Sequence, residues 1–290
     1  MWSPILKIEL LKEGRHIRLP ITVIFYNAIL AFVMLLFMVF NAETFQEGYY
    51  YNTSSYLHQF LIISSLQIAA VFLLIPFYVS GMFAVDREKY MMEQFAMIPG
   101  FNGQFVVAKI MMVLFINGLL FLSALPIICL SCIYSGISCF KVIRLGIMIL
   151  LFSFWSGSIT IFFYSVRARI RWAMAGTVIT QFMFVAGTVM IMEVIRNCAL
   201  SFSESGSLPA EVSGICLFFM ILNPLASYMG YYGNLTGETG LISFFCGHFG
   251  IDATSKTFSL FFYKVSSLMC LLVGILFLYL AVCRADRRQG

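Results

Sequence analysis

The chain has 290 residues, of which 61% are hydrophobic and only 11% are charged, and its formal net charge is +5. Average globular proteins carry about 25% charged residues, so this composition excludes a soluble enzyme and a disordered chain. The basic residues occur in a few clusters rather than on one basic face, which argues against a nucleic-acid-binding protein. The composition predicts an all-α, polytopic membrane protein.

The first 18 residues alternate charged and apolar side chains at helical spacing. At about 100° per residue, the charged residues Glu9, Lys12 and Glu13 fall on one side of a helix, while leucine and isoleucine cover the other. We expect residues 1–18 to form an amphipathic helix at the membrane surface, and Pro20 to reset the chain before the first span. A plain basic flank that only sets the topology is the alternative.

Six charge-free runs are long enough to cross a membrane. Crossing the ~30 Å hydrocarbon core takes about 20 apolar residues of helix. The runs are Ile21–Phe40, Leu57–Val85, Ile110–Ser131, Leu145–Val166, Trp172–Met192 and Val265–Cys283. With both termini in the cytoplasm, most of the 18 Lys and Arg residues fall inside, as the positive-inside rule requires. We therefore predict one six-helix transmembrane domain over residues 19–290, in the plasma membrane.

A seventh charge-free stretch, Ile215–Gly230, is interrupted by Asn223 and Pro224. Proline removes a backbone donor and disfavours helix in the residue before it. A seventh span would also move the basic C-terminal end to the outside. We predict an outer hairpin region over residues 193–256, in which this stretch is a re-entrant or surface hairpin, with a true span as the alternative.

The eight cysteines do not have the spacing of a metal site. Cys129 and Cys132 have C-x-x-C spacing without a second pair, and Cys246 with His248 is a lone fragment. We interpret the cysteines as small packing residues and expect no metal or cofactor in this chain. A disulfide among the cysteines predicted to lie outside stays open.

The sequence contains no motif for catalysis or nucleotide binding. A G-x-x-x-x-G-K-[ST] phosphate loop is missing, as are H-E-x-x-H and G-x-S-x-G. The charge-free runs hold no Asp, Glu, Lys or Arg to bind a coupling ion. We therefore predict that the chain is not an enzyme, and that any transport is powered by another protein. The neutral polar residues Asn27, Gln67 and Gln181 are candidates to line a path, with hydrogen bonding between helices as the alternative.

The segment between the second and third runs predicts a short helix over residues 86–98. Its apolar residues recur at i, i+4 and i+7: Met91, Phe95 and Ile98. Asp86 is placed to cap the first amides, and Pro99 follows the last turn. A loop that only joins two spans needs no such stripe. The segment predicts a docking helix for a partner, with a helix on the lipid surface as the alternative.

Residues Asp86 to Lys109 resemble the signature region of the type-2 ABC exporter permeases. That pattern runs approximately E-R-E-x-G-T-L-E-x-L-L-x-x-P, with a lysine further on. The matching residues are Asp86, Arg87, Glu88, Glu93, Phe95, Ile98, Pro99 and Lys109. The sequence departs from the pattern at Tyr90, Met91 and Ala108, where glycine or threonine is usual. The Asn223-Pro224 pair also resembles a turn that many members carry before their last span.

The resemblance implies a permease that works as a dimer, expected to be a homodimer, with two copies of a separate ATPase subunit that bind ATP and Mg. The helix over residues 86–98 would be the coupling helix, and residues 1–18 the elbow helix. The implied ATPase contacts are Asp86, Arg87, Glu88, Met91, Glu93, Phe95, Ile98 and Pro99. The implied transport path lies between two protomers and is lined by spans one, two and five, which carry Asn27, Gln67 and Gln181.

The composition of such a path favours amphipathic or hydrophobic substrates. The chain has 31 Phe and 17 Met, which offer adaptable apolar surface, and the path has no fixed charge. The family resembled includes exporters of amphipathic peptides such as phenol-soluble modulins, so peptide export is the preferred prediction and lipid or multidrug export the second. A non-transporting membrane scaffold or immunity protein is the alternative from another class.

Overall fold

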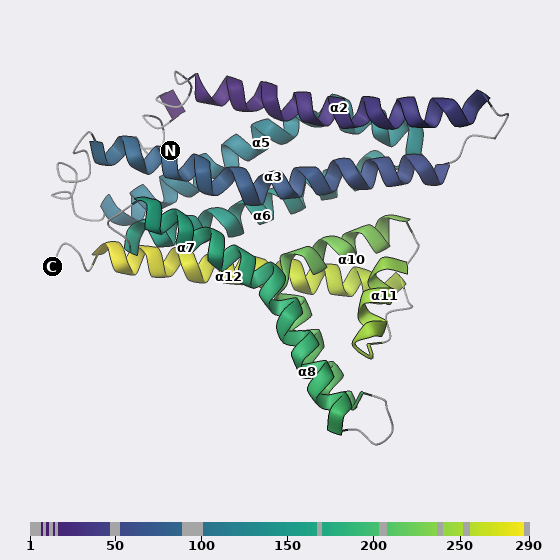
Figure 1. The fold of residues 1–290 in the computed structure, drawn as a ribbon. Helices are drawn as coiled ribbons and strands as arrows, with labels where there is room; N and C mark the ends of the chain where they lie inside the picture. The colour runs from purple at the N-terminus through teal and green to yellow at the C-terminus, as the bar shows by residue number, and fades with distance from the viewer. Residues whose placement is uncertain are drawn as a thin grey trace. The chain divides into compact units, whose positions relative to one another are not determined.

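The structure is a computed structural model, which describes residues 7, 10–11, 14, 17–46, 53–88, 101–166, 170–202, 208–236, 240–251 and 256–286. Every element in these ranges is a helix, which confirms the all-α prediction (Figure 1). The elements are α2 (Arg18–Gln46), α3 (Thr53–Glu88), α5 (Phe101–Ser135), α6 (Cys139–Val166), α7 (Ile170–Phe182), the π-helix η1 (Met183–Gly187), α8 (Thr188–Phe202), α9 (Ala210–Leu222), α10 (Pro224–Thr236), α11 (Gly240–His248) and α12 (Lys256–Asp286).

Among the described residues, six helical segments are long and apolar enough to cross a membrane. They are Arg18–Phe40, Tyr56–Phe83, Gly103–Ser135, Cys139–Val166, Ile170–Ser201 and Phe258–Arg284. Each covers one predicted run almost completely, and the fifth joins α7, η1 and α8 into one span. The prediction of a polytopic helical membrane protein is confirmed.

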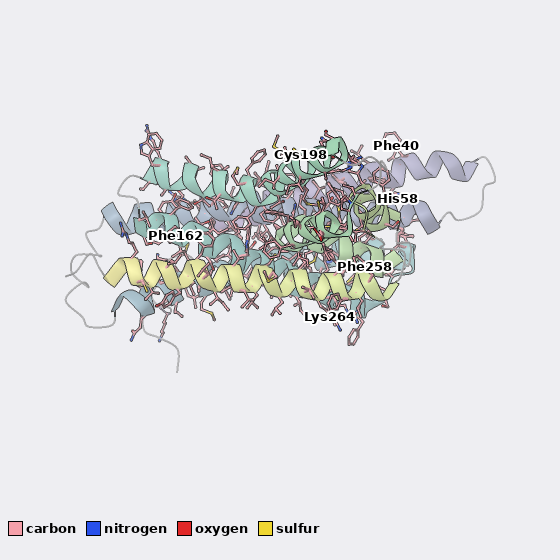
Figure 2. The ribbon with its side chains drawn as sticks, turned by 90° about the horizontal axis from the view of Figure 1, so that it is seen from below. Phe40, His58, Phe162, Cys198, Phe258 and Lys264 are labelled. Carbon is pink, nitrogen blue, oxygen red and sulfur yellow. The ribbon has the colours of Figure 1, made fainter. Side chains whose placement is uncertain are left out.

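The outward faces of these helices are apolar as well. Ile133 is 76% exposed and Phe140 is 71% exposed. Phe40 on α2 also points away from its helix, as does Lys264 near the start of α12 (Figure 2). Soluble monomers rarely expose contiguous apolar patches of more than a few hundred Å², so this surface is suited to lipid.

The helices extend beyond the charge-free runs and include charged residues. α6 contains Lys141 and Arg144 in its first turns, and the fifth span contains Glu193. A helix can continue into the membrane interface, where long charged side chains reach water. Lys109 in α5 differs from these residues, because its side chain is buried.

The chain divides into two compact units, Met1–Met174 with Leu276–Gly290, and Ala175–Ile275. In the first, α3 packs against α5 and α6, and α2 packs against α5 and α3 (Figure 1). α6 has the most buried span, and its Phe152 and Trp155 side chains are fully buried. Phe72 of α3 contacts both rings, at centroid distances of 5.9 and 5.7 Å. Aromatic contacts therefore hold α3 against α6.

The second unit contains the break predicted at Asn223 and Pro224. Ala210–Leu222 and Pro224–Gly233 meet at 95°, and Asn223 is the one residue between α9 and α10. The break is confirmed. α9 and α10 have 13 residues each. A helix of that length measures about 20 Å, so neither helix alone crosses a ~30 Å hydrocarbon core.

The prediction that Pro20 separates the N-terminal segment from the first span is wrong. The predicted interfacial helix over residues 1–18 lies largely outside the described residues. α2 begins at Arg18, so Pro20 lies inside its first turn and does not separate two elements. Proline is tolerated there, because the first N–H groups of a helix have no intrahelical acceptor.

Candidate functional site

The predicted coupling residues lie at and beyond the end of α3. Asp86, Arg87 and Glu88 form the last positions of this helix, which continues through Asp86 without a break. The prediction that Asp86 caps a new helix is therefore wrong at this position. The remaining coupling residues lie outside the described residues, so their arrangement stays a prediction: Met91, Glu93, Phe95, Ile98 and Pro99.

Asn27 joins α2 to α5. Its Nδ2 donates to Ser123 Oγ at 2.9 Å and to the carbonyl of Val23 at 2.9 Å. Its Oδ1 is buried and accepts no hydrogen bond from a described residue. Asn27 therefore makes the hydrogen bond between helices that the sequence allowed, and it keeps one acceptor unused.

Two buried glutamines of α3 face the interior with their amides unsatisfied. Gln59 is 0% exposed and Gln67 is 1% exposed. No described group makes a hydrogen bond of ordinary geometry with either amide, although the Tyr26 hydroxyl of α2 faces Gln67. Sequence analysis identified Gln67 and missed Gln59, although both lie in the same apolar run. Gln59 lies about two helical turns before Gln67, and this spacing could have identified it as a residue on the same face of the helix.

A small cavity lies where α2 meets α3 and α5. Its volume is about 20 Å³, and its lining includes Thr22 of α2, Tyr78 of α3 and Asn117 of α5. A water molecule needs about 10–15 Å³ measured in this way and two or more polar partners, so the cavity has room for one. The α2 seam is therefore imperfectly packed.

Gln181, the third predicted path residue, belongs to the second unit. It lies on α7 and is 5% exposed. Asn27 and Gln67 belong to the first unit, on α2 and α3. A path shared by all three residues stays a prediction.

Lys109 lies in an aromatic box at the start of the α5 span. It is 0% exposed, and its Nζ lies 5.5 Å from the Phe83 ring centre and 5.1 Å from that of Phe105. Phe83 also stacks on Tyr164 of α6, at 5.1 Å. These rings come from α3, α5 and α6. From the sequence, Lys109 only precedes the charge-free run Ile110–Ser131, because spacing along the chain does not show which rings surround a lysine.

In the second unit, Asn223 connects the α9–α10 break to the π-helix. Its Nδ2 donates to Val185 O and to Thr188 Oγ1, each at 2.9 Å. Its Oδ1 accepts from the Leu225 N–H at 2.9 Å. The Thr188 N–H bonds to Met183 O, five residues earlier, which is the π spacing. The bulge and the break are thus one joint, and π-bulges are frequent at functional sites.

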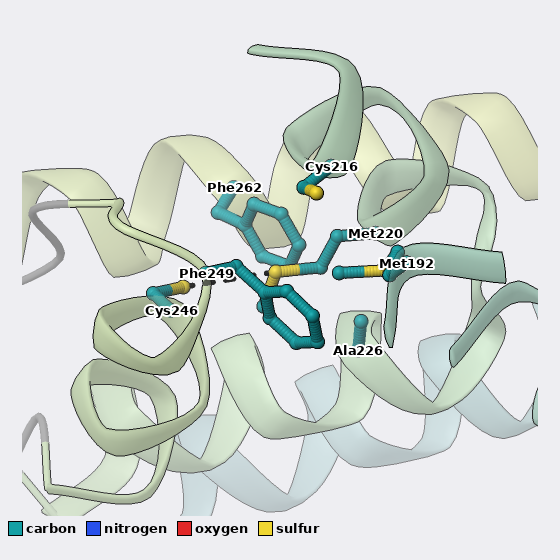
Figure 3. Close-up of a cluster of buried hydrophobic side chains, with 7 residues drawn as sticks. All are labelled: Met192, Cys216, Met220, Ala226, Cys246, Phe249 and Phe262. Carbon is teal, nitrogen blue, oxygen red and sulfur yellow. Dashed lines mark hydrogen bonds between the residues drawn. The ribbon is translucent and has the colours of Figure 1, made fainter. Parts of the chain in front are cut away.

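A sulfur-rich cluster fills the interior beside this joint (Figure 3). Its buried members are Met192, Cys216, Met220, Ala226, Cys246, Phe249 and Phe262. The Cys246 thiol donates to the Met220 sulfur at 3.7 Å. Burial raises the pKa of Cys246 to about 12, so its thiol stays protonated near neutral pH. Cys246 is therefore a packing residue in an apolar core, as the sequence suggested.

A charged cluster joins α8 to α11. His248 Nε2 lies 2.7 Å from Glu193 Oε1, and Arg196 Nη1 lies 3.3 Å from Glu193 Oε2. All three side chains are partly exposed. Cys246 and His248, which are close in sequence, therefore do not form a common site. Cys246 packs in the core, and His248 pairs with Glu193.

An open apolar groove of about 680 Å³ runs between α5 and α6. Cys129, Cys132 and Cys139 line it together with aliphatic and aromatic side chains. All eight cysteines are free. Among the described residues, no group of three or more His, Cys, Asp or Glu is arranged to hold a metal ion. The groove offers apolar contact but no charged or amide group to orient a ligand.

Comparison with family models, with curated proteins and with solved structures finds no match to the chain. The resemblance to exporter permeases therefore depends on the residues Asp86 to Lys109 and on the arrangement of spans.

Proposed function

We propose that this chain is the membrane-spanning permease subunit of an ATP-driven ABC exporter. The observation that carries the proposal is the sequence of the segment Asp86 to Lys109, with its acidic-basic-acidic start, apolar stripe, proline and lysine. Two copies of the chain in the plasma membrane, with their termini in the cytoplasm, pair with two copies of a separate ATPase. The ATPase binds ATP and Mg and hydrolyses the nucleotide.

Lys109 supports a mechanical role for this segment. The segment leaves α3 and returns to α5, and Lys109 packs against Phe83 of α3 and Phe105 of α5 on either side of it. A push on residues 86–98 by the ATPase therefore acts on two helices that are held together. In this mechanism the chain supplies the path and the partner supplies the energy.

Amphipathic or hydrophobic peptides are the substrates that we favour. The predicted path residues Asn27, Gln67 and Gln181 carry no charge, and the buried amides of α3 are those of Gln59 and Gln67. Such amides complement peptide groups, and the Phe and Met side chains that are frequent in the chain adapt to varied apolar faces. Lipid or drug export would use the same apolar surface.

Copurification and ATP hydrolysis test the proposal. The chain is purified in nanodiscs together with the ATPase that the proposal expects to be encoded beside it, and ATP hydrolysis is measured with and without an amphipathic peptide. We expect a stable complex and hydrolysis that the peptide stimulates. Phe95→Ala or Glu93→Ala should abolish the stimulation while the protein remains inserted, because both changes alter the proposed docking helix.

The matched control is Phe140→Ala, which removes an exposed ring from α6. We expect this variant to keep its stimulation, because Phe140 lies near the opposite end of the span. A chain that copurifies with no ATPase, or that retains stimulation in both docking-helix variants, would exclude the exporter. The non-transporting scaffold would then be the better explanation.

A further inference from the structure

The amides of Gln59 and Gln67 require an explanation beyond packing. In a membrane interior each unsatisfied polar group is unfavourable, and buried polar groups in native proteins almost always have partners. Gln59 and Gln67 are at most 1% exposed. The nitrogen and oxygen of the Gln59 amide have no hydrogen-bond partner among the described residues, and the Gln67 amide has only the Tyr26 hydroxyl of α2 beside it. Ser64, between them, is equally buried, but its hydroxyl donates to Leu61 O at 2.9 Å. The glutamines are therefore the exception on this face.

α2 covers this face and is weakly held. The buried residues in its described part are Tyr26, Leu30 and Met34, a single stripe. Tyr26 faces Gln67. α2 and α3 run in opposite directions side by side (Figure 1). With Tyr26 beside Gln67, the equal rise along the two helices brings the level of Met34 on α2 close to that of Gln59 on α3. The stripe therefore follows α3 from one glutamine toward the other.

The joint between α2 and α5 is also weak. A hydrogen bond joins the Asn27 side chain to Ser123 Oγ at 2.9 Å, and Asn27 Oδ1 has no partner among the described residues. The cavity of about 20 Å³ interrupts the packing of α2 against α3 and α5 near Thr22. The unpaired Asn27 Oδ1 and the cavity reduce the number of contacts that hold α2 against α3 and α5. Separating α2 from these helices therefore breaks fewer favourable contacts.

We propose that α2 separates from α3 and α5, and that Gln67 and Gln59 then bind the main-chain amide groups of a peptide. Each glutamine offers two donors and an acceptor, which complement a peptide C=O and N–H. A peptide inside a membrane has unpaired main-chain groups at helix ends and in extended segments, which need such partners. The inference rests on the proposed function, because it names the substrate contacts of the exporter.

Direct peptide binding tests the site without any ATPase. The purified chain in nanodiscs is titrated with a fluorescein-labelled synthetic amphipathic peptide of Leu, Lys and Ser, followed by fluorescence anisotropy. We expect Gln67→Met and Gln59→Met each to weaken binding about tenfold, the loss of roughly one or two hydrogen bonds. We also expect their thermal unfolding midpoints to be unchanged or higher, because each change removes an unsatisfied amide.

Ser64→Ala is the matched control, since Ser64 lies between the glutamines and is already satisfied within its own helix. This variant should bind the peptide as the unchanged protein does. Unchanged peptide binding by both glutamine variants would overturn the proposal. A lowered unfolding midpoint in either variant would also overturn it, because the amide would then be paired in the closed state.

A reversible cross-link tests the movement of α2. Asn27→Cys and Ser123→Cys are combined, because these side chains touch across the seam. We expect the oxidised pair to lose peptide binding at least about tenfold and to regain it with dithiothreitol, while oxidant alone leaves the unchanged protein active in binding. Equal binding by the oxidised and reduced pair would show that α2 does not have to separate.

These outcomes distinguish the inference from the proposed function. Peptide binding that depends on Gln67, in a chain that associates with no ATPase, would retain the site and exclude the exporter. Peptide-stimulated hydrolysis that persists in both glutamine variants would retain the exporter and exclude the site.

Discussion

The interior of this protein is mainly apolar, and a few buried polar side chains are the exceptions. Lys109 is fully buried, and its ammonium group lies over two aromatic rings. Gln59 is equally buried, and its amide has no hydrogen-bond partner among the described residues. The first residue is stabilised where it lies, and the second is not. Single substitutions should therefore act in opposite directions at these two positions.

Removing the charge of Lys109 should destabilise the protein. Lys109→Met keeps most of the apolar length of the side chain but removes the attraction to Phe83 and Phe105. We expect the free energy of unfolding to fall by about 0.5–2 kcal/mol, the range of cation–π contacts. Denaturant unfolding in nanodiscs measures the change.

Lys264→Met is the control for this prediction, because Lys264 is an exposed lysine on α12. A surface substitution of this kind should change stability by less than about 0.5 kcal/mol. Equal stabilities of the two variants would show that the aromatic box contributes nothing.

At the scale of elements, the π-helix and the broken α9–α10 pair explain each other. A π-helix turn disturbs the regular hydrogen bonding of the span, and Asn223 supplies a donor to Val185 O and to Thr188 Oγ1. The same residue caps the start of α10 through the Leu225 N–H. One side chain thus satisfies polar groups on two helices, and the 95° bend becomes possible in an apolar setting.

Asn223→Ala should loosen this joint. It removes the shorter of two hydrogen bonds to Val185 O, leaving the 3.4 Å bond from Thr188 Oγ1, and it removes the cap at Leu225. We therefore expect a loss of about 1–3 kcal/mol in the free energy of unfolding. Hydrogen exchange should increase in η1 and in the first turn of α10, measured by mass spectrometry. Asn223→Asp keeps the acceptor for the Leu225 N–H but loses the donor to Val185 O and Thr188 Oγ1. Hydrogen exchange should therefore stay slow in the first turn of α10 and increase in η1.

Asn197→Ala, on an exposed position of α8, is the reference. It should leave the hydrogen-exchange rates of η1 and of the first turn of α10 unchanged. If exchange in η1 is the same in all three variants, the π-helix does not depend on Asn223.

At the scale of the whole molecule, the number of spans determines whether the two ends of the chain lie on the same side of the membrane. Six crossings return the chain to its starting side, whereas a seventh crossing by Ala210–Gly233 would not. The basic residues at the two ends favour a shared cytoplasmic side, because Lys and Arg are retained on that face of the membrane. The proposed partnership with an ATPase needs this arrangement.

Protease protection tests the topology. A folded epitope is fused to either end of the chain, and intact cells are treated with protease from outside. We expect both epitopes to be protected until the membrane is permeabilised, since both ends are proposed to be cytoplasmic. Cleavage of the C-terminal epitope in intact cells would mean that the bent pair crosses as a seventh span.

The membrane class and the spans could be predicted from the sequence with little ambiguity. Leucine, isoleucine and phenylalanine in charge-free runs leave a helix across lipid as the only arrangement that satisfies the backbone, so Ile21–Phe40 and its five counterparts were recognisable. Asn223-Pro224 marked its break because proline cannot donate a hydrogen bond. These properties are local, and each follows from a short stretch of chain.

Tertiary structure decided which polar residues matter. Lys109 and Lys264 each lie just before an apolar run, and the rings of Phe83 and Phe105 packed against the first one distinguish them. Gln59 and Ser64 lie on the same helix and are equally buried, but of the two only Ser64 has a hydrogen bond within the described part of the chain, to Leu61 O. Burial and pairing are properties of the assembled helices, whereas hydrophobicity is a property of each residue.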